Sequence, residues 1–174
     1  MRWLRDKLLP REVRERLALA RGERILAHAP SAEGTLVATT HALHLADGHA
    51  VPWQHIDRAR WSDSGLHFTE EGAGEWFVAV EEPGKLAETI HERVTATIVV
   101  SRHVPLDERT TAEETTQDSD ADEPRGFRLV ARRPPGGSDI SWQIHIDEGV
   151  DPEDPRVAEK APVALANLRE QMGV

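Results

Sequence analysis

Histidine is the residue type in this chain whose spacing most suggests chemistry. Four of the nine histidines fall within TLVATTHALHLADGHAVPWQHI, the run from residue 35 to residue 56, and these are His41, His44, His49 and His55. Imidazole binds transition metals where three or four ligands converge, and it can also sense pH. The run contains no helical H-x-x-x-H or H-E-x-x-H motif. We therefore assign no metal ligand, and we interpret the four as polar residues on the solvent side of an antiparallel sheet.

The local geometry of His41 and His44 leaves one alternative open. Side chains three positions apart on a continuous strand face opposite sides of the sheet. A turn at Thr40 and His41 would instead place the two imidazoles on different strands, where they could approach each other.

Nucleophilic catalysis has weaker support in the sequence. Ser101 and His103 would share one face of a strand, but no acid is evident beside them, and no G-x-S-x-G motif occurs. Gly72-Ala73-Gly74 lacks the Lys-Ser/Thr ending and the following helix of a phosphate loop, so it indicates a turn. We predict a non-enzymatic protein with no catalytic residues and no cofactor.

Tryptophan supplies most of the aromatic surface, because the chain has five Trp, three Phe and no Tyr. Large aromatic side chains usually anchor cores. We expect this role for Trp53, Trp61, Trp76 and Trp142, with a ligand-lined pocket as the alternative.

Trp3 lies instead on a basic N-terminal segment with Arg2, Arg5, Lys7 and Arg11. These five residues are candidates for contact with a membrane or a partner, because a basic amphipathic helix can lie on an anionic surface. The interpretation that we favour is a helix packed on the rest of the domain with its charges solvated, because the apolar face is short. Pro10 interrupts the pattern, so residues 2–20 should form two short helices, the second stopped by Gly22.

Charge and composition exclude several classes. The net charge is −10, which disfavours a nucleic-acid partner. Cysteine is absent, so disulfides, thiolate catalysis and Cys-ligated zinc are excluded. No signal-peptide apolar run and no membrane-length apolar stretch occurs, and we expect a cytoplasmic location.

Short apolar runs separated by turn residues predict a β-rich first half. Strands are expected at residues 24–29, 35–40, 42–46, 50–61, 65–69 and 75–80, followed by a helix over 85–96. The helix is indicated by Leu86, Ile90 and Val94, which form one stripe. Hairpin-length connections predict an antiparallel meander that folds as a sandwich or a small barrel.

The second half changes character at an acidic segment. A strand is expected at 97–106, and residues 107–125 hold eight acidic and two basic residues without apolar periodicity, which predicts a disordered loop. Strands at 126–133 and 140–147 precede a helix that begins at Asp154-Pro155, with a kink or break at Pro162. The acidic segment could separate two domains, but we favour an insertion within one hairpin that pairs 98–106 with 126–133.

The run GERILAHAP…GTLVATTHALHLADGHAVPWQHIDRARW resembles bacterial pleckstrin-homology-like (PH-like) and GRAM-like domains. The likeness rests on Gly22-Glu23, Leu36 to Thr39, Leu43-His44-Leu45, and Val51-Pro52 with Ile56, and covers residues 22–97. The chain is also similar to actinobacterial proteins with a tail like Trp142…Asp154-Pro155. The resemblance implies a split antiparallel β-barrel capped by the helix at 85–96, and no single activity.

The expected organisation is therefore α+β. It comprises an N-terminal helical segment (1–21), a PH-like barrel with its capping helix and following strand (22–106), a disordered acidic loop (107–125), and a β-hairpin plus C-terminal helix (126–174) packed on the same domain. We expect a binding or scaffolding module with a protein partner. The alternative is a peripheral membrane module that uses the basic N-terminus.

Overall fold

The computed structural model describes residues 9–107 and 124–173, and it is an α+β fold with three antiparallel sheets. The chain divides into two compact units, each with its own apolar core. Unit 1 comprises the residues up to Ile98 together with Arg133–Asp139. Unit 2 comprises Val99–Arg132 and the residues from Ile140 onward.

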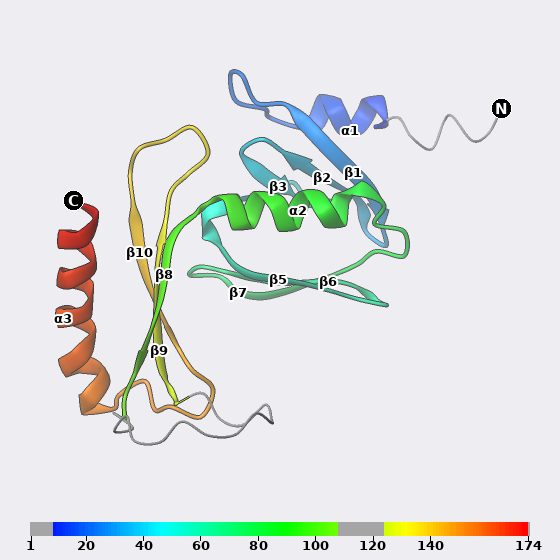
Figure 1. Ribbon diagram of the computed structural model, residues 1–174. Helices are drawn as coiled ribbons and strands as arrows, with labels where there is room; N and C mark the ends of the chain where they lie inside the picture. The colour runs from blue at the N-terminus through cyan, green and yellow to red at the C-terminus, as the bar shows by residue number, and fades with distance from the viewer. Residues whose placement is uncertain (1–8, 108–123, 174) are drawn as a thin grey trace, which may run out of the picture. The chain divides into compact units, whose positions relative to one another are not determined.

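The described residues of unit 1 form seven strands in two sheets (Figure 1). The first sheet has the order β1-β2-β3-β4, formed by β1 (Ile25–Ser31), β2 (Gly34–Thr39), β3 (Ala42–His44) and β4 (Ala50–Pro52). The second has the order β5-β6-β7, formed by β5 (Ile56–Ser62), β6 (Gly65–Glu70) and β7 (Gly74–Ala79). Both sheets are meanders because every connection within them is a short turn.

The predicted strand over 50–61 is two strands separated by one turn of 3-10 helix, η1 (Trp53–His55). Pro52 ends β4, since it lacks an N–H for further ladder pairing. Trp53 is fully buried in η1, and its indole N–H donates to the carbonyl of Thr39 at 2.9 Å. This turn carries the chain from the first sheet to the second and anchors the crossing in the core.

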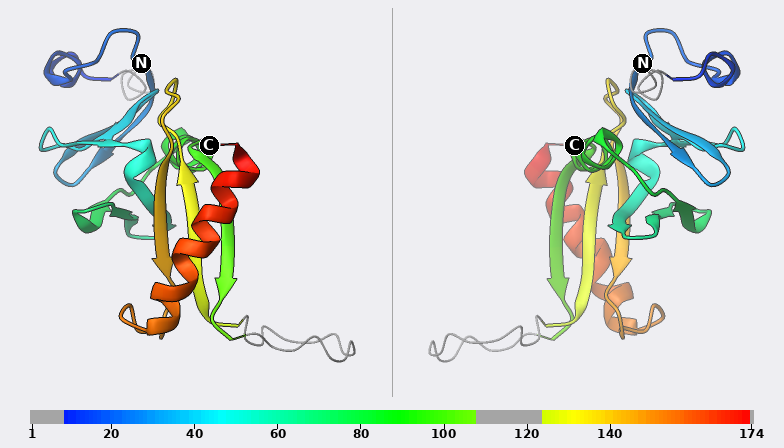
Figure 2. Two further views of the ribbon diagram at one scale, coloured as in Figure 1. Left: turned by 90° about the vertical axis from the view of Figure 1, so that its left-hand side faces the viewer. Right: turned by 90° about the vertical axis from the view of Figure 1, so that its right-hand side faces the viewer.

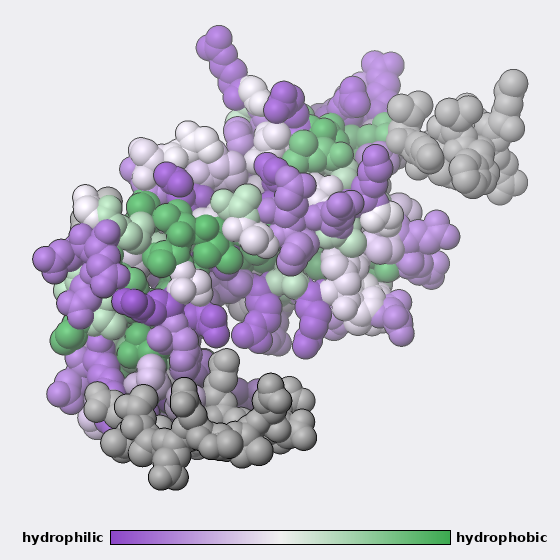
Figure 3. Space-filling view, in the orientation of Figure 1, coloured by the Kyte–Doolittle hydropathy of each residue, from purple (hydrophilic) through white to green (hydrophobic). Residues whose placement is uncertain are grey.

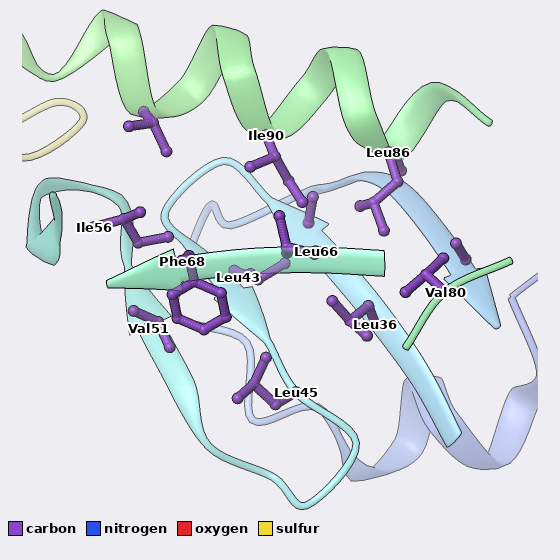
Figure 4. Close-up of a cluster of buried hydrophobic side chains, with 14 of the residues drawn as sticks. Leu36, Leu43, Leu45, Val51, Ile56, Leu66, Phe68, Val80, Leu86 and Ile90 are labelled. Atoms are coloured by element: carbon purple, nitrogen blue, oxygen red, sulfur yellow. The ribbon is translucent and has the colours of Figure 1, made fainter. Parts of the chain in front are cut away.

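The helix α2 (Lys85–Ala96) has the bounds predicted from its apolar stripe. Leu86, Ile90 and Val94 are its buried residues, and the helix contacts β1, β2 and β5. Figure 4 shows Leu86 and Ile90 pointing from α2 toward side chains of both sheets, among them Leu36 and Leu66. One apolar cluster therefore joins the helix to the two sheets.

The strands of unit 1 do not close into a barrel. The two sheets meet at one corner, where the backbone N–H of Ala32 donates to the carbonyl of Ala79 at 3.2 Å. The α+β class is confirmed, whereas the closed ladder that a barrel requires is absent from the described residues.

Unit 2 is a three-stranded sheet with a helix on one face (Figure 2). Its order is β10-β9-β8, from β8 (Ile98–Pro105), β9 (Gly126–Arg132) and β10 (Ser141–Ile146). The helix α3 (Pro155–Met172) packs Val157, Ala161 and Leu168 against Phe127 and Leu129 of β9. Because β8 and β9 are neighbours, the strands on either side of the acidic segment lie in one sheet.

The start of α3 follows the predicted capping pattern. Asp154 is the N-cap, its carboxylate accepts from the N–H of Arg156, and Pro155 is the first helical residue. The predicted break at Pro162 is absent, since α3 runs through this position without interruption.

Two boundaries differ from those expected from sequence. The helix α1 (Arg11–Arg16) ends six residues before Gly22, because Leu17 adopts an extended conformation. The division between units lies at Ile98, so β8 belongs with β9 and β10 rather than with the strands that precede it. The part of the N-terminal segment over residues 1–8, and most of the acidic segment, lie outside the described residues.

Polar and charged residues dominate the surface seen in Figure 3, and apolar residues gather in separate areas. In the two described ranges, no helix combines the length and the apolar character needed to cross a bilayer.

Candidate functional sites: histidine pairs and the outer face of the second sheet

The carboxylate of Glu23 lies close to two of the four clustered histidines. His41 lies in the β2–β3 turn and His44 lies within β3, so the two histidines do not share a strand. His44 Nε2 lies 3.1 Å from Glu23 Oε1, and His41 Nδ1 lies 3.9 Å from Glu23 Oε2. The hydroxyl of Thr39 donates to the same carboxylate.

The Glu23 carboxylate is only 5% exposed, so its charge must be satisfied inside the protein. Burial acts to raise the pKa of Glu23, but the hydrogen bonds from Thr39, from the Ala20 N–H and from His44, together with the charge of His44, lower it below its ordinary value of 4.5. Glu23 therefore ties the segment before β1 to the β2–β3 hairpin as a carboxylate.

His49 makes a second histidine–carboxylate pair. Its Nε2 lies 2.9 Å from Glu70 Oε2, and its ring stacks on Trp76 with centroids 5.3 Å apart. Because His49 precedes β4 whereas Glu70 and Trp76 belong to β6 and β7, this cluster links the two sheets of unit 1.

The fourth histidine, His55, is exposed in η1 and joins neither carboxylate. The four histidines therefore lie at three separate places. Within residues 9–107 and 124–173, no group of three His, Cys, Asp or Glu side chains is arranged to hold a metal ion.

A third pair in unit 2 supplies an acid that was not evident beside His103 in the sequence. Asp147 Oδ2 lies 2.7 Å from His103 Nε2 and accepts from the Gly126 N–H at 2.8 Å. Burial acts to raise the pKa of Asp147, but bonds from His103 and Gly126, with the charges of His103 and Arg128, lower it below 3.8. The acid was missed because it lies 44 residues away and reaches His103 only through sheet pairing.

The His103–Asp147 pair resembles the histidine and the acid of a catalytic triad, but a triad also requires a nucleophile. A carboxylate can hold an imidazole in one tautomer, but catalysis also needs a nucleophile bonded to the other nitrogen. Among the described residues, no hydrogen bond joins the Ser101 hydroxyl to His103. The contacts of Asp147 instead connect β8, the start of β9 and the end of β10, which is a structural role.

The tryptophans behave mainly as core residues. Trp53 is fully buried, and Trp61 and Trp76 pack half-buried against the core of unit 1. Trp142 packs on the core of unit 2, where the guanidinium of Arg169 lies 5.7 Å from its ring centroid. Of these four tryptophans, Trp76 also lines a hollow on the β5-β6-β7 sheet.

The outer face of the β5-β6-β7 sheet is the surface best suited to binding. Its side chains form two cross-strand rows, Arg60–His67–Phe77 and Arg58–Thr69–Glu75. Phe77 is 51% exposed, and both arginines are exposed. The rows line an open hollow of about 360 Å³. We call these six residues the outer face.

Neither arginine of the outer face is neutralised within the described parts of the chain. No ion pair or hydrogen bond joins Arg58 or Arg60 to another described side chain. Sequence reasoning missed this surface because its residues alternate with buried ones along three strands, and only the ladder register places them side by side.

Four of the five candidate contact residues of the N-terminus, Arg2, Trp3, Arg5 and Lys7, lie outside the described residues. The fifth, Arg11, begins α1 with its side chain 89% exposed and 2.6 Å from Glu15. No residue of α1 is buried. This helix therefore lacks the buried apolar face that packing on the domain would give it.

Comparisons with models of protein families, with curated proteins and with solved structures found no match to this chain.

Proposed function

We propose that the chain is a cytoplasmic, non-enzymatic binding or scaffolding module that recognises a protein partner through the outer face. One observation carries this proposal. Two arginines without a partner among the described residues and a half-exposed phenylalanine project from the same side of a hydrogen-bonded sheet.

These residue types are those that dominate binding energy at protein interfaces. Arginine and aromatic residues are enriched among interface hot spots because they combine a large contact area with directional hydrogen bonding. Strands hold them in place through ladder pairing, so little conformational entropy of the backbone is lost on binding. A solvated Phe77 also gains hydrophobic stabilisation when a partner covers it.

The proposal is tested with full-length chains that carry an affinity tag. Partners captured by the wild type are quantified against those captured by R58E/R60E and by F77S. The matched control is R14E/R16E, which makes the same charge change at the same i, i+2 spacing on α1, where both arginines are exposed. We expect specific partners to be lost from the two outer-face variants and kept by the control.

Equal capture by all four proteins would overturn the proposal. Circular dichroism of each variant, with fluorescence of the buried Trp53, separates loss of binding from loss of folding.

Unit 1 is further proposed to be a PH-like or GRAM-like domain. Two features support this: seven strands in two antiparallel sheets followed by one helix, and the contact between Ala32 and Ala79 that joins the sheets at a corner. A crystal or NMR structure tests it. We expect β1 and β7 to continue the pairing that begins at this corner, and sheets that part at the corner would contradict the assignment.

A peripheral membrane module that uses Arg2, Trp3, Arg5, Lys7 and Arg11 is a second candidate. The favouring observation is that α1 has no buried residue, so Arg11 at its start is not packed in the domain core. Co-sedimentation with vesicles tests it, using zwitterionic lipid with and without anionic lipid. Binding to anionic vesicles that is lost on deletion of residues 1–16, and kept in R58E/R60E, is the expected result. Absence of binding by the intact chain would refute this candidate.

A further inference from the structure

The types of side chain on the outer face differ from one strand to the next. The β5 column holds Arg58 and Arg60, the β6 column holds Thr69 and His67, and the β7 column holds Glu75 and Phe77. Since neighbouring strands lie about 4.8 Å apart, the cationic column and the aromatic ring are separated by roughly 10 Å. A partner that covers the face must therefore present acidic groups on one side and an apolar group on the other.

The spacing along β5 defines what those acidic groups are. Alternate residues of a strand share a face and lie about 6.7 Å apart. Carboxylates at positions i and i+2 of an extended peptide have the same separation. Each guanidinium can donate two N–H bonds to one such carboxylate, and this paired geometry is stronger and more directional than a single contact.

The β7 side of the face supplies an apolar contact. Phe77 packs its ring on His67, with centroids 4.6 Å apart, and keeps about half of its surface in solvent. The two rings are tilted by 38° to each other, and the exposed part of Phe77 offers an apolar surface on which an aliphatic or aromatic side chain can pack.

We infer that the outer face binds an acidic protein segment in extended conformation. Two carboxylates spaced i, i+2 pair with Arg58 and Arg60, and one apolar side chain of the segment packs on Phe77. This inference rests on the proposed function and specifies its partner. It is carried by charge complementarity, because both arginines lack an acidic partner within the described chain.

The same face is poorly matched to a polyphosphate. Glu75 lies in the row of Arg58 and would repel a uniform anionic backbone. A segment that alternates charged with neutral residues avoids Glu75 and still reaches the β5 column.

Synthetic peptides with a fluorescein label test the inference by anisotropy. The probe alternates Glu and Thr and carries one Phe near its end. A second peptide has the same composition with its Glu residues in one block, and a third has Lys in place of Glu. We expect the alternating acidic peptide to bind best, with affinity that falls as salt is added, because the exposed charges are screened.

The variants of the preceding section assign the binding to residues. R58E/R60E should weaken binding of the alternating peptide by about tenfold or more, which corresponds to roughly 1.4 kcal/mol. F77S should weaken it several-fold, and the control R14E/R16E should leave it unchanged. In NMR spectra, amide shifts should concentrate in β5, β6 and β7.

The failures of the two proposals are distinguishable. If no acidic peptide binds, or if R14E/R16E is as damaging as R58E/R60E, the acidic-segment inference is overturned. If captured partners are nevertheless lost from R58E/R60E and F77S, the binding function of the face stands without it. Preference for the Lys peptide would overturn the charge assignment directly.

Discussion

At the residue scale, the chemistry of unit 1 depends on carboxylates that are paired with histidine. Glu23 is almost completely buried and accepts hydrogen bonds from Thr39 and from the Ala20 N–H, with His44 at 3.1 Å. Leaving such donors without their acceptor has a larger energetic cost than the bonds themselves contribute. The Gly22-Glu23 motif thus has a structural explanation, because its carboxylate connects the entry of β1 to the β2–β3 hairpin.

We expect Glu23→Gln to lower the free energy of unfolding at neutral pH by about 1–3 kcal/mol. The amide keeps the shape of the side chain but loses its charge and one acceptor. Urea unfolding followed by tryptophan fluorescence measures the loss. The control is Glu33→Gln, at an exposed position, which should change the stability by less than about 0.5 kcal/mol.

The pH dependence of this effect has a defined sign. Because the folded protein lowers the pKa of Glu23 below 4.5, the unfolded chain binds the proton more readily. The stability that Glu23 contributes is therefore fully present above pH 4.5 and is lost as the pH falls through the folded pKa. The wild type and Glu23→Gln should converge at acidic pH, and a constant difference would contradict the assignment.

At the element scale, α2 is held by one apolar stripe. Ile90 is 1% exposed beneath the middle of the helix, whereas the next residue, His91, faces solvent. We expect Ile90→Ala to lower the free energy of unfolding by about 2–5 kcal/mol, because it removes buried methyl groups and leaves a cavity between the helix and the sheets. His91→Ala should change the free energy of unfolding by no more than about 0.5 kcal/mol. Similar losses for both, measured by chemical unfolding, would mean that α2 is not held by this stripe.

Pro162 lies inside α3 and removes one of the helical hydrogen bonds. Proline cannot donate to the carbonyl four residues earlier, at Ala158, yet α3 is continuous and Pro162 is exposed. Packing of Val157, Ala161 and Leu168 on the sheet offsets this cost.

We expect Pro162→Ala to stabilise unit 2 by about 1–3 kcal/mol, since it restores a helical hydrogen bond and removes no buried contact. Hydrogen exchange of the β9 and β10 amides measures the change. Val163→Ala, at a neighbouring exposed position, is the control and should leave exchange nearly unchanged. Faster exchange in Pro162→Ala would show that the helix depends on its proline.

At the scale of the whole molecule, each unit must be stabilised by its own core. In unit 2, the N–H of Leu106 donates to the carbonyl of Arg125 at 3.0 Å, so the two ends of the acidic segment are already joined by sheet pairing. The segment between them is not required to bring β8 and β9 together.

We therefore expect replacement of residues 108–123 by a turn of about four residues to preserve unit 2. The shorter connection should raise its stability by about 1 kcal/mol, because closing a shorter loop costs less entropy. A Gly/Ser segment of the original length separates the effect of length from that of charge. Thermal unfolding measures both, and loss of the sheet in the short variant would show that the segment contributes to folding.

Periodicity and turn residues predicted the positions of most elements correctly. The bounds of α2 and the start of α3 agree with prediction, because an amphipathic stripe and an N-cap are local signals. The end of α1 and the division of residues 50–61 into two strands were not predicted, and of the kink or break predicted at Pro162 the break does not occur. In each case a tertiary contact or a single backbone conformation overrode the local pattern.

The sequence by itself determined which residues are apolar, where turns occur and that cysteine chemistry is absent. Only the tertiary structure decided which polar residues pair, namely His44 with Glu23, His49 with Glu70 and His103 with Asp147, and that two arginines share a sheet face with Phe77. The physical reason is the separation along the chain of the residues that interact. Element type follows from neighbours along the chain, whereas pairing across strands follows from register, which brings together residues that the chain itself keeps far apart.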